Sequence, residues 1–419
     1  MAPSFELPSS FLAKLYFLSF GGGCQIGWYA VLNSLDFFDD KYKGYSVSFK
    51  FGIAVYLAQF LVTPIMAKIS ERFGYSSRVI VPFLVVGCVI GFLPFQAALY
   101  GGSENGFWMI MMLLFFMGFL NNICYSSIIG LTSQLPGEHT TNFLIGSGIA
   151  GIGMSIIRMA LAYIISKDAS ITPERSKEIS VTIFFVVAAI FIAWCVFLHL
   201  AFVKSEFYNA FLEKTNLTRL NDSEASEDGD SFLETSSSSS DRDISRKPGR
   251  DFNTLFGIFS KTSLYVILIA VTYIQMYTVF PGVMQQKPMG NMEKGTKLTS
   301  MNMIFSIFFL IGKKAGQYRK YYNAQIVTAT VLFRFVLMAF FMIQAAFDLP
   351  IFNTIWFGYI NILLFGFTNG FVTCALFILA PEKIEPEKKE VSGFVNVFGL
   401  TAGIVIGTFT ALPFAHLRS

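Results

Sequence analysis

The chain has 419 residues, of which 54% are hydrophobic, 16% aromatic and only 14% charged, with a mean hydropathy of +0.57 and a formal net charge of +4. Soluble domains carry about 25% charged residues, so the composition excludes a soluble globular protein and predicts an all-α polytopic membrane protein. The small net charge gives no reason to expect a nucleic-acid partner. Five cysteines without paired spacing and three scattered histidines predict neither a disulfide framework nor a metal site, and no cofactor is expected.

Apolar runs of about 20 residues, the length that crosses a hydrocarbon core, predict the membrane spans. The first run is too long for a signal peptide and lacks a basic leader, so we interpret it as a span. The first half of the chain contains six such runs: Phe11–Leu35, Phe49–Ala67, Val79–Leu99, Gly106–Ser133, Asn142–Ser166 and Ile179–Val203.

The first span carries a row of residues suited to ligand binding. Gln25, Trp28 and Leu32 are spaced i, i+3 and i+7, so they share one face of a helix. A planar ligand could stack on the indole while the amide hydrogen-bonds to the edge of the ligand. The alternative is that Trp28 belongs to the interfacial aromatic belt, although its position well inside the span favours ligand binding.

The fourth and fifth spans add polar groups. Asn122 and Tyr125 lie in a polar patch of the fourth span, which is open to the same two interpretations. Arg158 lies in the middle of the fifth span without an evident acidic partner. A buried arginine in a span faces a partner or a water-filled cavity, so Arg158 either contacts the ligand or pairs with a carbonyl or carboxylate elsewhere.

The longest polar interruption, 204–260, divides the chain into an N-terminal six-helix half, residues 1–203, and a C-terminal five-helix half, residues 261–419. Its centre, Asn221–Asp243, is rich in acidic residues and serines. Such a segment cannot bury enough apolar surface to offset its ordering entropy, so we expect a disordered cytosolic linker. Its acidic serine tract would also suit an acid-directed kinase, which would then be a partner.

Five spans follow the linker. Arg334 lies in the middle of the ninth span and has the same two interpretations as Arg158. In the eleventh span, Gly399, Gly403 and Gly407 stand four residues apart on one face, which is typical of close helix packing, and Gly146–Gly153 in the fifth span is expected to pack likewise. The predicted spans of this half are Ser263–Met284, Leu298–Gly312, Ala324–Phe347, Ile351–Ala380 and Val391–Phe414.

Eleven spans put the two termini on opposite sides of the lipid bilayer. Lysines and arginines are almost evenly divided between the two sets of short loops, so the charge bias is weak. We place the N-terminus and the linker in the cytosol, the C-terminus outside, and the protein in the plasma membrane. The sequons at Asn216 and Asn221 would then carry no glycan.

These features together resemble the equilibrative nucleoside transporter family. The order of eleven spans with a long hydrophilic loop after the sixth is similar to that of the family. The residues that carry the resemblance are Trp28, Gly146–Gly151 (G-S-G-I-A-G, with Ser147 in place of a glutamine), Phe280-Pro281, Gly366–Gly370, Pro381–Pro386 and Ser392-Gly393.

The resemblance implies a 6+5 helix bundle similar to the major facilitator fold, with a central site reached alternately from each side. It places Gln25, Trp28 and Leu32 at a nucleobase cavity and Tyr125 where the family often has a base-reading glutamine. Ser306 and Arg334 fall at positions that are polar in the family too. With Phe280 at the end of the seventh span, the candidate substrate-binding residues are Gln25, Trp28, Leu32, Asn122, Tyr125, Arg158, Phe280, Ser306, Phe309, Lys313 and Arg334.

The eighth span departs from the family pattern F-N-x-F-D-x-x-G-R, whose Asp and Arg contact sugar hydroxyls. Here Phe309 replaces the aspartate and Lys313 replaces the arginine. Burying two ribose hydroxyls without partners costs about 1–3 kcal/mol each, so we expect free nucleobases to compete about as well as nucleosides. Phe305, Phe309 and Lys313 share a helix face, and Lys313, at the end of the span, is expected to hold its ammonium group in water.

The function predicted from the sequence is facilitative transport of a small molecule, a nucleoside or a nucleobase, by alternating access. Acidic residues fall only at span ends, which weighs against obligatory proton coupling. The alternative is a non-transporting scaffold or sensor on the same fold, similar to the battenin branch. An enzyme is not expected, because paired carboxylates, an H-E-x-x-H motif and a Cys/His arrangement are all missing from the sequence.

Overall fold

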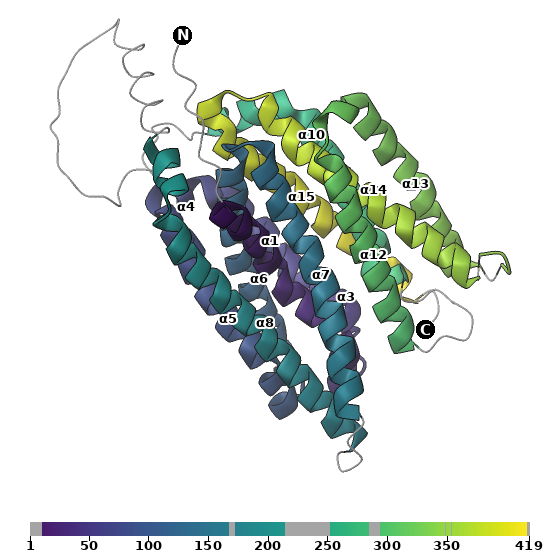
Figure 1. Ribbon diagram of the computed structural model, residues 1–419. Coiled ribbons are helices and arrows are strands. Elements are labelled where there is room, and N and C mark those ends of the chain that lie inside the picture. Colours follow the sequence, from purple (N-terminus) through teal and green to yellow (C-terminus); the bar gives the residue numbers. More distant parts are fainter. Residues whose placement is uncertain are drawn as a thin grey trace, which may run out of the picture.

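The computed structural model describes residues 11–166, 172–213, 252–284, 294–347, 349–352 and 354–416. These residues are mainly helical and contain no strand (Figure 1). Helices are the natural result of such apolar sequences, because a span must satisfy its backbone hydrogen bonds internally.

Six long helices form the N-terminal half. Short helices interrupt the chain around the second of them, where Pro64 at the start of a 3-10 turn ends the regular α-helix. The elements are α1 Phe11–Leu32, α2 Leu35–Lys41, α3 Val47–Val62, η1 Thr63–Ile65, α4 Met66–Arg72, α5 Tyr75–Tyr100, α6 Glu104–Ser133, α7 Gly137–Ser166 and α8 Pro173–Val203.

Five long helices form the C-terminal half. The first continues into an irregular π-helical segment at Phe280, whose φ and ψ are −109° and 134°. The elements are α10 Phe252–Thr278, η2 Val279–Val283, α12 Lys294–Gly316, η3 Arg319–Tyr321, α13 Ala324–Ala346, α14 Ile355–Glu382, η4 Pro386–Lys388, α15 Lys389–Ala411 and η5 Leu412–His416.

Each of the eleven predicted spans overlaps one of these long helices. Nine of the described helices are long and apolar enough to cross a membrane by length and composition. The two that fall short, α1 and α12, carry glycines, amides and lysines among their apolar residues. The count of eleven spans therefore stays a prediction.

The predicted linker, 204–260, differs from the structure at both of its ends. Residues 206–213 are helical, and Phe207, Tyr208 and Phe211 are buried in the main core. At the other end, α10 already begins at Phe252. Aromatic residues next to a span can pack against it. The prediction missed this packing because it used the polar composition of the whole segment. The acidic serine tract, with both sequons, lies outside the described residues.

Polar side chains cap several helices where the chain re-enters the bundle. The hydroxyl of Ser103 accepts a hydrogen bond from the backbone of Gly106 at 3.0 Å, and the side chain of Asn323 accepts one from Ile326 at 2.9 Å. The first amide groups of a helix have no partner within the helix, so these caps fix where α6 and α13 begin.

The predicted glycine packing is confirmed for α15 and for Gly146 on α7, but not for Gly153. A Cβ at Gly399, Gly403 or Gly407 would overlap backbone atoms of α10, and one at Gly146 would overlap the carbonyl oxygen of Leu18 on α1. Glycine thus allows α15 to approach α10 and α7 to approach α1 at backbone distance. Gly153, by contrast, has no neighbouring atom within 4 Å of an added Cβ.

The two halves meet mainly through α7 with α12 and through α15 with α3 and α6 (Figure 1). On the side where α1 begins, Arg78 of α5 pairs with Glu390 of α15 at 3.8 Å, and both side chains are buried. A Cβ at Gly130 of α6 would meet the ring of Phe394 of α15. The halves are therefore tightly closed on this side.

Replacing Gly146 should destabilise the protein. We expect Gly146→Ala to lower stability by about 1–3 kcal/mol, because the added methyl group forces α7 away from α1. Gly153→Ala is the matched control on the same helix and should be neutral or slightly stabilising. Apparent melting temperatures in detergent measure both, and equal values for the two variants would contradict the packing argument.

Candidate functional site

A central cavity lies between the two halves, lined by α1, α3, α6 and α7 on one side and by α10, α12 and α15 on the other. Amide and aromatic side chains dominate its wall, and no aspartate or glutamate lines it among the described residues. Nine of the eleven sequence-predicted residues line this cavity: Gln25, Trp28, Leu32, Asn122, Tyr125, Phe280, Ser306, Phe309 and Lys313.

The face predicted on the first span borders the cavity. Gln25, Trp28 and Leu32 all contribute to the wall, as their helical spacing indicated. The indole of Trp28 packs edge-on against the ring of Tyr56, with centroids 5.1 Å apart. Trp28 is thus part of the protein interior and does not belong to an interfacial belt.

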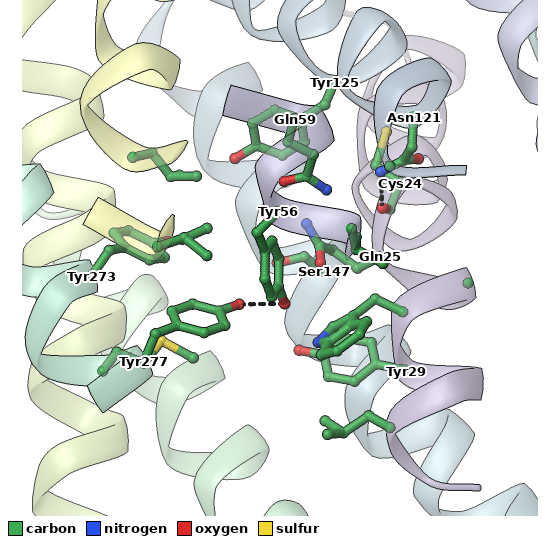
Figure 2. A pocket seen from close by; sticks show the side chains of 18 of the residues that line it. Cys24, Gln25, Tyr29, Tyr56, Gln59, Asn121, Tyr125, Ser147, Tyr273 and Tyr277 are labelled. Atoms are coloured by element: carbon green, nitrogen blue, oxygen red, sulfur yellow. Dashed lines mark hydrogen bonds between the residues drawn. The ribbon is translucent and has the colours of Figure 1, made fainter. Parts of the chain in front are cut away.

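A group of tyrosines closes one side of the cavity. The hydroxyl groups of Tyr56 on α3 and Tyr277 on α10 are hydrogen-bonded at 2.7 Å, which joins the two halves directly (Figure 2). Tyr273 stacks on Tyr277 one turn away, with centroids 6.3 Å apart. These tyrosines were not predicted from the sequence. A tyrosine in an apolar run can line a cavity or pack in the core, and its spacing in the sequence does not distinguish the two.

The polar patch of α6 also serves as a structural clamp. The amide nitrogen of Asn122 donates to the carbonyl of Gln59 at 2.9 Å and to the hydroxyl of Thr63 at 2.7 Å. Asn121 donates to the carbonyl of Cys24 at 2.8 Å (Figure 2). These bonds tie α6 to α3 and α1, so the nitrogen of Asn122 is already engaged. Tyr125 lies one turn further along and packs against Phe143 with centroids 5.2 Å apart.

One face of α12 forms an aromatic wall. Phe280 stacks on Phe305 with centroids 5.2 Å apart, and Phe305 stacks on Phe309 at 5.5 Å. The predicted common face of Phe305, Phe309 and Lys313 is therefore confirmed. Ser306 lies on the same side and is buried.

The expectation that Lys313 holds its ammonium group in water is wrong. Its side chain is 2% exposed, and its Nζ donates to the carbonyl of Leu144 at 2.7 Å and to the hydroxyl of Ser147 at 2.5 Å. The helix α12 continues to Gly316, so Lys313 lies about one turn inside it. Helix α7 covers this turn, and a Cβ at Gly148 would already contact Leu310.

Asn302 is a cavity residue that the sequence analysis missed. Its side chain is 4% exposed, and neither its amide nitrogen nor its amide oxygen has a hydrogen-bond partner. Asn302 lies four residues before Ser306 and seven before Phe309, so the three share one face of α12. That spacing was a usable signal, because an amide on the cavity face of a span needs a partner that a ligand can supply.

Arg158 does not line the cavity, and the expectation that it lacks an acidic partner is wrong. Its guanidinium donates to the carbonyl of Asn33 at 3.2 Å and to the hydroxyl of Ser180 at 2.8 Å, and it pairs with Asp36 at 3.5 Å. The short helix α2 packs against α3, α5 and α8, and its Asp36 reaches the arginine. The structural alternative holds for this residue.

Arg334 also lies outside the cavity wall, in the core of the C-terminal half. It is fully buried and donates to Gln275, to the carbonyl of Phe365 and to Thr368, at 3.1, 2.8 and 2.9 Å. Its guanidinium lies 4.2 Å from the ring centre of Phe365. These contacts join α10, α13 and α14, as expected for a residue that pairs within the bundle.

The comparison with known proteins agrees with this architecture. A family model described as nucleoside transporter matches residues 110–416. The chain belongs to the nucleoside transporter family. It is therefore an integral, multi-pass membrane carrier with a major-facilitator-like fold, and the resemblance found in the sequence is confirmed.

The similar curated proteins are distant relatives. Equilibrative nucleoside transporter 4 of Danio rerio is 23% identical over 98% of this chain and 85% of its own length. Equilibrative nucleoside transporter 2 of Homo sapiens is 23% identical over 72% of this chain and 70% of its own length. Equilibrative nucleotide transporter 1 of Arabidopsis thaliana is 20% identical over 95% of this chain and 85% of its own length.

Solved structures show the same fold. The E. coli fucose:proton symporter FucP has a TM-score of 0.59 at 14% identity and covers 99% of both chains. The proton:xylose symporter XylE has a TM-score of 0.61 at 12% identity and covers 96% of this chain and 88% of its own. At such identities the likeness concerns the fold alone.

The contacts of Arg158 predict a structural phenotype. We expect Arg158→Leu to lower stability by about 1–3 kcal/mol, because it leaves the carbonyl of Asn33 and the hydroxyl of Ser180 without a donor. Folded protein yield and melting temperature should fall, while the KM of the remaining folded carriers should stay within about twofold. A large rise in KM at unchanged stability would instead indicate that Arg158 contacts substrate.

Proposed function

We propose that this chain is a facilitative carrier for nucleosides, nucleobases or both, working by alternating access at the central cavity. The observation that carries the proposal is the composition of the wall: stacked aromatic rings beside amides and hydroxyls. Such a surface suits a flat, polar-edged heterocycle, which gains stacking energy on its faces and hydrogen bonds at its edges. The amide of Asn302, which has no partner at the cavity wall, adds a group that the polar edge of a ligand can bind.

Residues from both halves would contact the substrate. Trp28 and Tyr56 would present ring surfaces from the N-terminal half, and Phe280 and Phe305 would do so from the C-terminal half. Gln25 and Asn302 would bind the polar edge. The Tyr56–Tyr277 hydrogen bond crosses between the halves and would have to break when the halves separate.

Two features favour transport without obligatory proton coupling and with little dependence on ribose. The described cavity wall carries no carboxylate that could exchange a proton with the substrate. Phe309, which lines the wall, offers no acceptor to sugar hydroxyls. A free base such as hypoxanthine should therefore compete about as well as its nucleoside.

Uptake into vesicles tests the proposed function. We expect labelled adenosine, uridine or hypoxanthine to equilibrate across the membrane without a pH gradient. Trp28→Ala should lower kcat/KM about fivefold to a hundredfold, the size of one lost base–aromatic stack. Trp194→Ala on the exposed face of α8 is the matched control and should change uptake little. Absence of uptake for all three compounds would overturn the proposal.

We also propose that the N-terminus and the linker face the cytosol of a plasma-membrane protein and that the C-terminus faces outside. The acidic serine tract of the linker supports this orientation, and the charge bias of the short loops is too weak to oppose it. The sequons at Asn216 and Asn221 should then remain unglycosylated in a eukaryotic host. A shift in mobility after glycosidase treatment, lost in the double Asn→Gln variant, would reverse the orientation.

A further inference from the structure

Lys313, Ser147 and Phe309 form one cluster at the cavity wall. The Nζ of Lys313 donates to the hydroxyl of Ser147 at 2.5 Å and lies 3.8 Å from the ring centre of Phe309. The ammonium group therefore lies between a hydroxyl group and an aromatic ring.

The charge of Lys313 is not cancelled by any neighbour in the described residues. Its two hydrogen-bond acceptors, the carbonyl of Leu144 and the hydroxyl of Ser147, are neutral, and no described carboxylate lies within ion-pair distance. Lys313 is also the only charged side chain among the described residues of the cavity wall. A buried cation without a counter-ion is costly. Arg334 offsets this cost with neutral acceptors inside the C-terminal half, whereas Lys313 lies at the cavity wall, where a bound anion could pair with it.

The rest of the wall indicates how a ligand would reach this cation. The rings of Phe280, Phe305 and Phe309 form a continuous stack that ends at Lys313. Asn302 lies toward the other end of the same helix face, with both amide atoms unpartnered. A flat ligand lying along the stack can hydrogen-bond to the amide at one end and direct an oxygen toward the ammonium group at the other.

We propose that Lys313 is an anion-recognition group and that the carrier takes purine or pyrimidine compounds bearing a negatively charged oxygen. This inference rests on the proposed function and narrows its substrate class. Charge-assisted hydrogen bonds are about twice as strong as neutral ones, so the anion gains more from this corner than a neutral ligand does. The negative oxygen could belong to an anionic base or to the phosphate of a nucleoside monophosphate.

Competition and direct uptake in vesicles test the inference at one pH. Labelled urate represents the anionic bases and labelled UMP the phosphates, with hypoxanthine and uridine as their neutral counterparts. We expect urate, UMP or both to be taken up. An anion that is taken up should inhibit the uptake of labelled hypoxanthine at least as well as its neutral counterpart does. Urate alone identifies the charged base as the ligand, and UMP alone identifies the phosphate.

Variants locate the effect at Lys313. Lys313→Gln should raise the inhibition constant of the anion relative to that of hypoxanthine about tenfold to a hundredfold, which corresponds to about 1.4–2.8 kcal/mol. Lys313→Arg, which keeps the charge, should preserve most of the preference. Lys314→Gln is the matched control, because this exposed neighbour bonds to Gln317 and does not line the cavity.

Phe309→Asp gives a second, independent variant. It places a carboxylate one turn before Lys313, where an ion pair at i, i+4 would cancel the charge. We expect it to weaken competition by anions and to strengthen competition by ribosides.

The outcomes separate the inference from the proposed function. If neutral compounds are transported but neither urate nor UMP competes in the unmodified protein, the anion inference is overturned and the proposed function stands. If Lys313→Gln and Phe309→Asp both keep the preference for anions, recognition lies elsewhere and the inference is overturned as well. If no compound of either class is transported, the proposed function itself fails.

Discussion

Polar groups inside a bilayer have no water to bind, so each of them must find a partner within the protein or within a ligand. This constraint organises the molecule. Arg158 and Arg334, the two arginines that stand out in apolar runs, donate to carbonyls and hydroxyls. Arg158 also pairs with a carboxylate from a short helix, and Arg334 also donates to an amide oxygen. Both are used to hold helices together, and neither reaches the cavity.

The same constraint draws attention to two residues of the cavity wall. Asn302 is buried at the cavity wall without a partner, and Lys313 is buried with neutral partners only. Such groups are costly in a packed interior but useful where a substrate completes their hydrogen bonds. The unmet polar capacity of α12, next to a stack of phenylalanine rings, is therefore the strongest local indication of binding.

The contacts between the two halves are of two kinds, which suits a carrier that must open. On the side where α1 begins, α6 and α15 approach closely and the Arg78–Glu390 pair is buried, so opening there requires separation of a packed interface. At the cavity, the halves are joined by hydrogen bonds between side chains or from a side chain to a carbonyl, Tyr56 with Tyr277 and Lys313 with Leu144 and Ser147. Within each half, glycines instead allow helices to meet at backbone distance, which lets each half move as a unit.

The sequence by itself determined the class of fold, the position of each long helix and two faces of the cavity wall. Apolar length specifies a span, and helical spacing specifies a face, so Gln25, Trp28 and Leu32, or Phe305 and Phe309, could be assigned to common surfaces from their spacing alone. Both signals are local, and neither reports which helix lies opposite. Only the tertiary structure decided that Asp36 returns to Arg158, that α7 covers Lys313, and that Tyr56 meets Tyr277 across the halves, because these contacts join residues separated by 122, 169 and 221 positions in the chain.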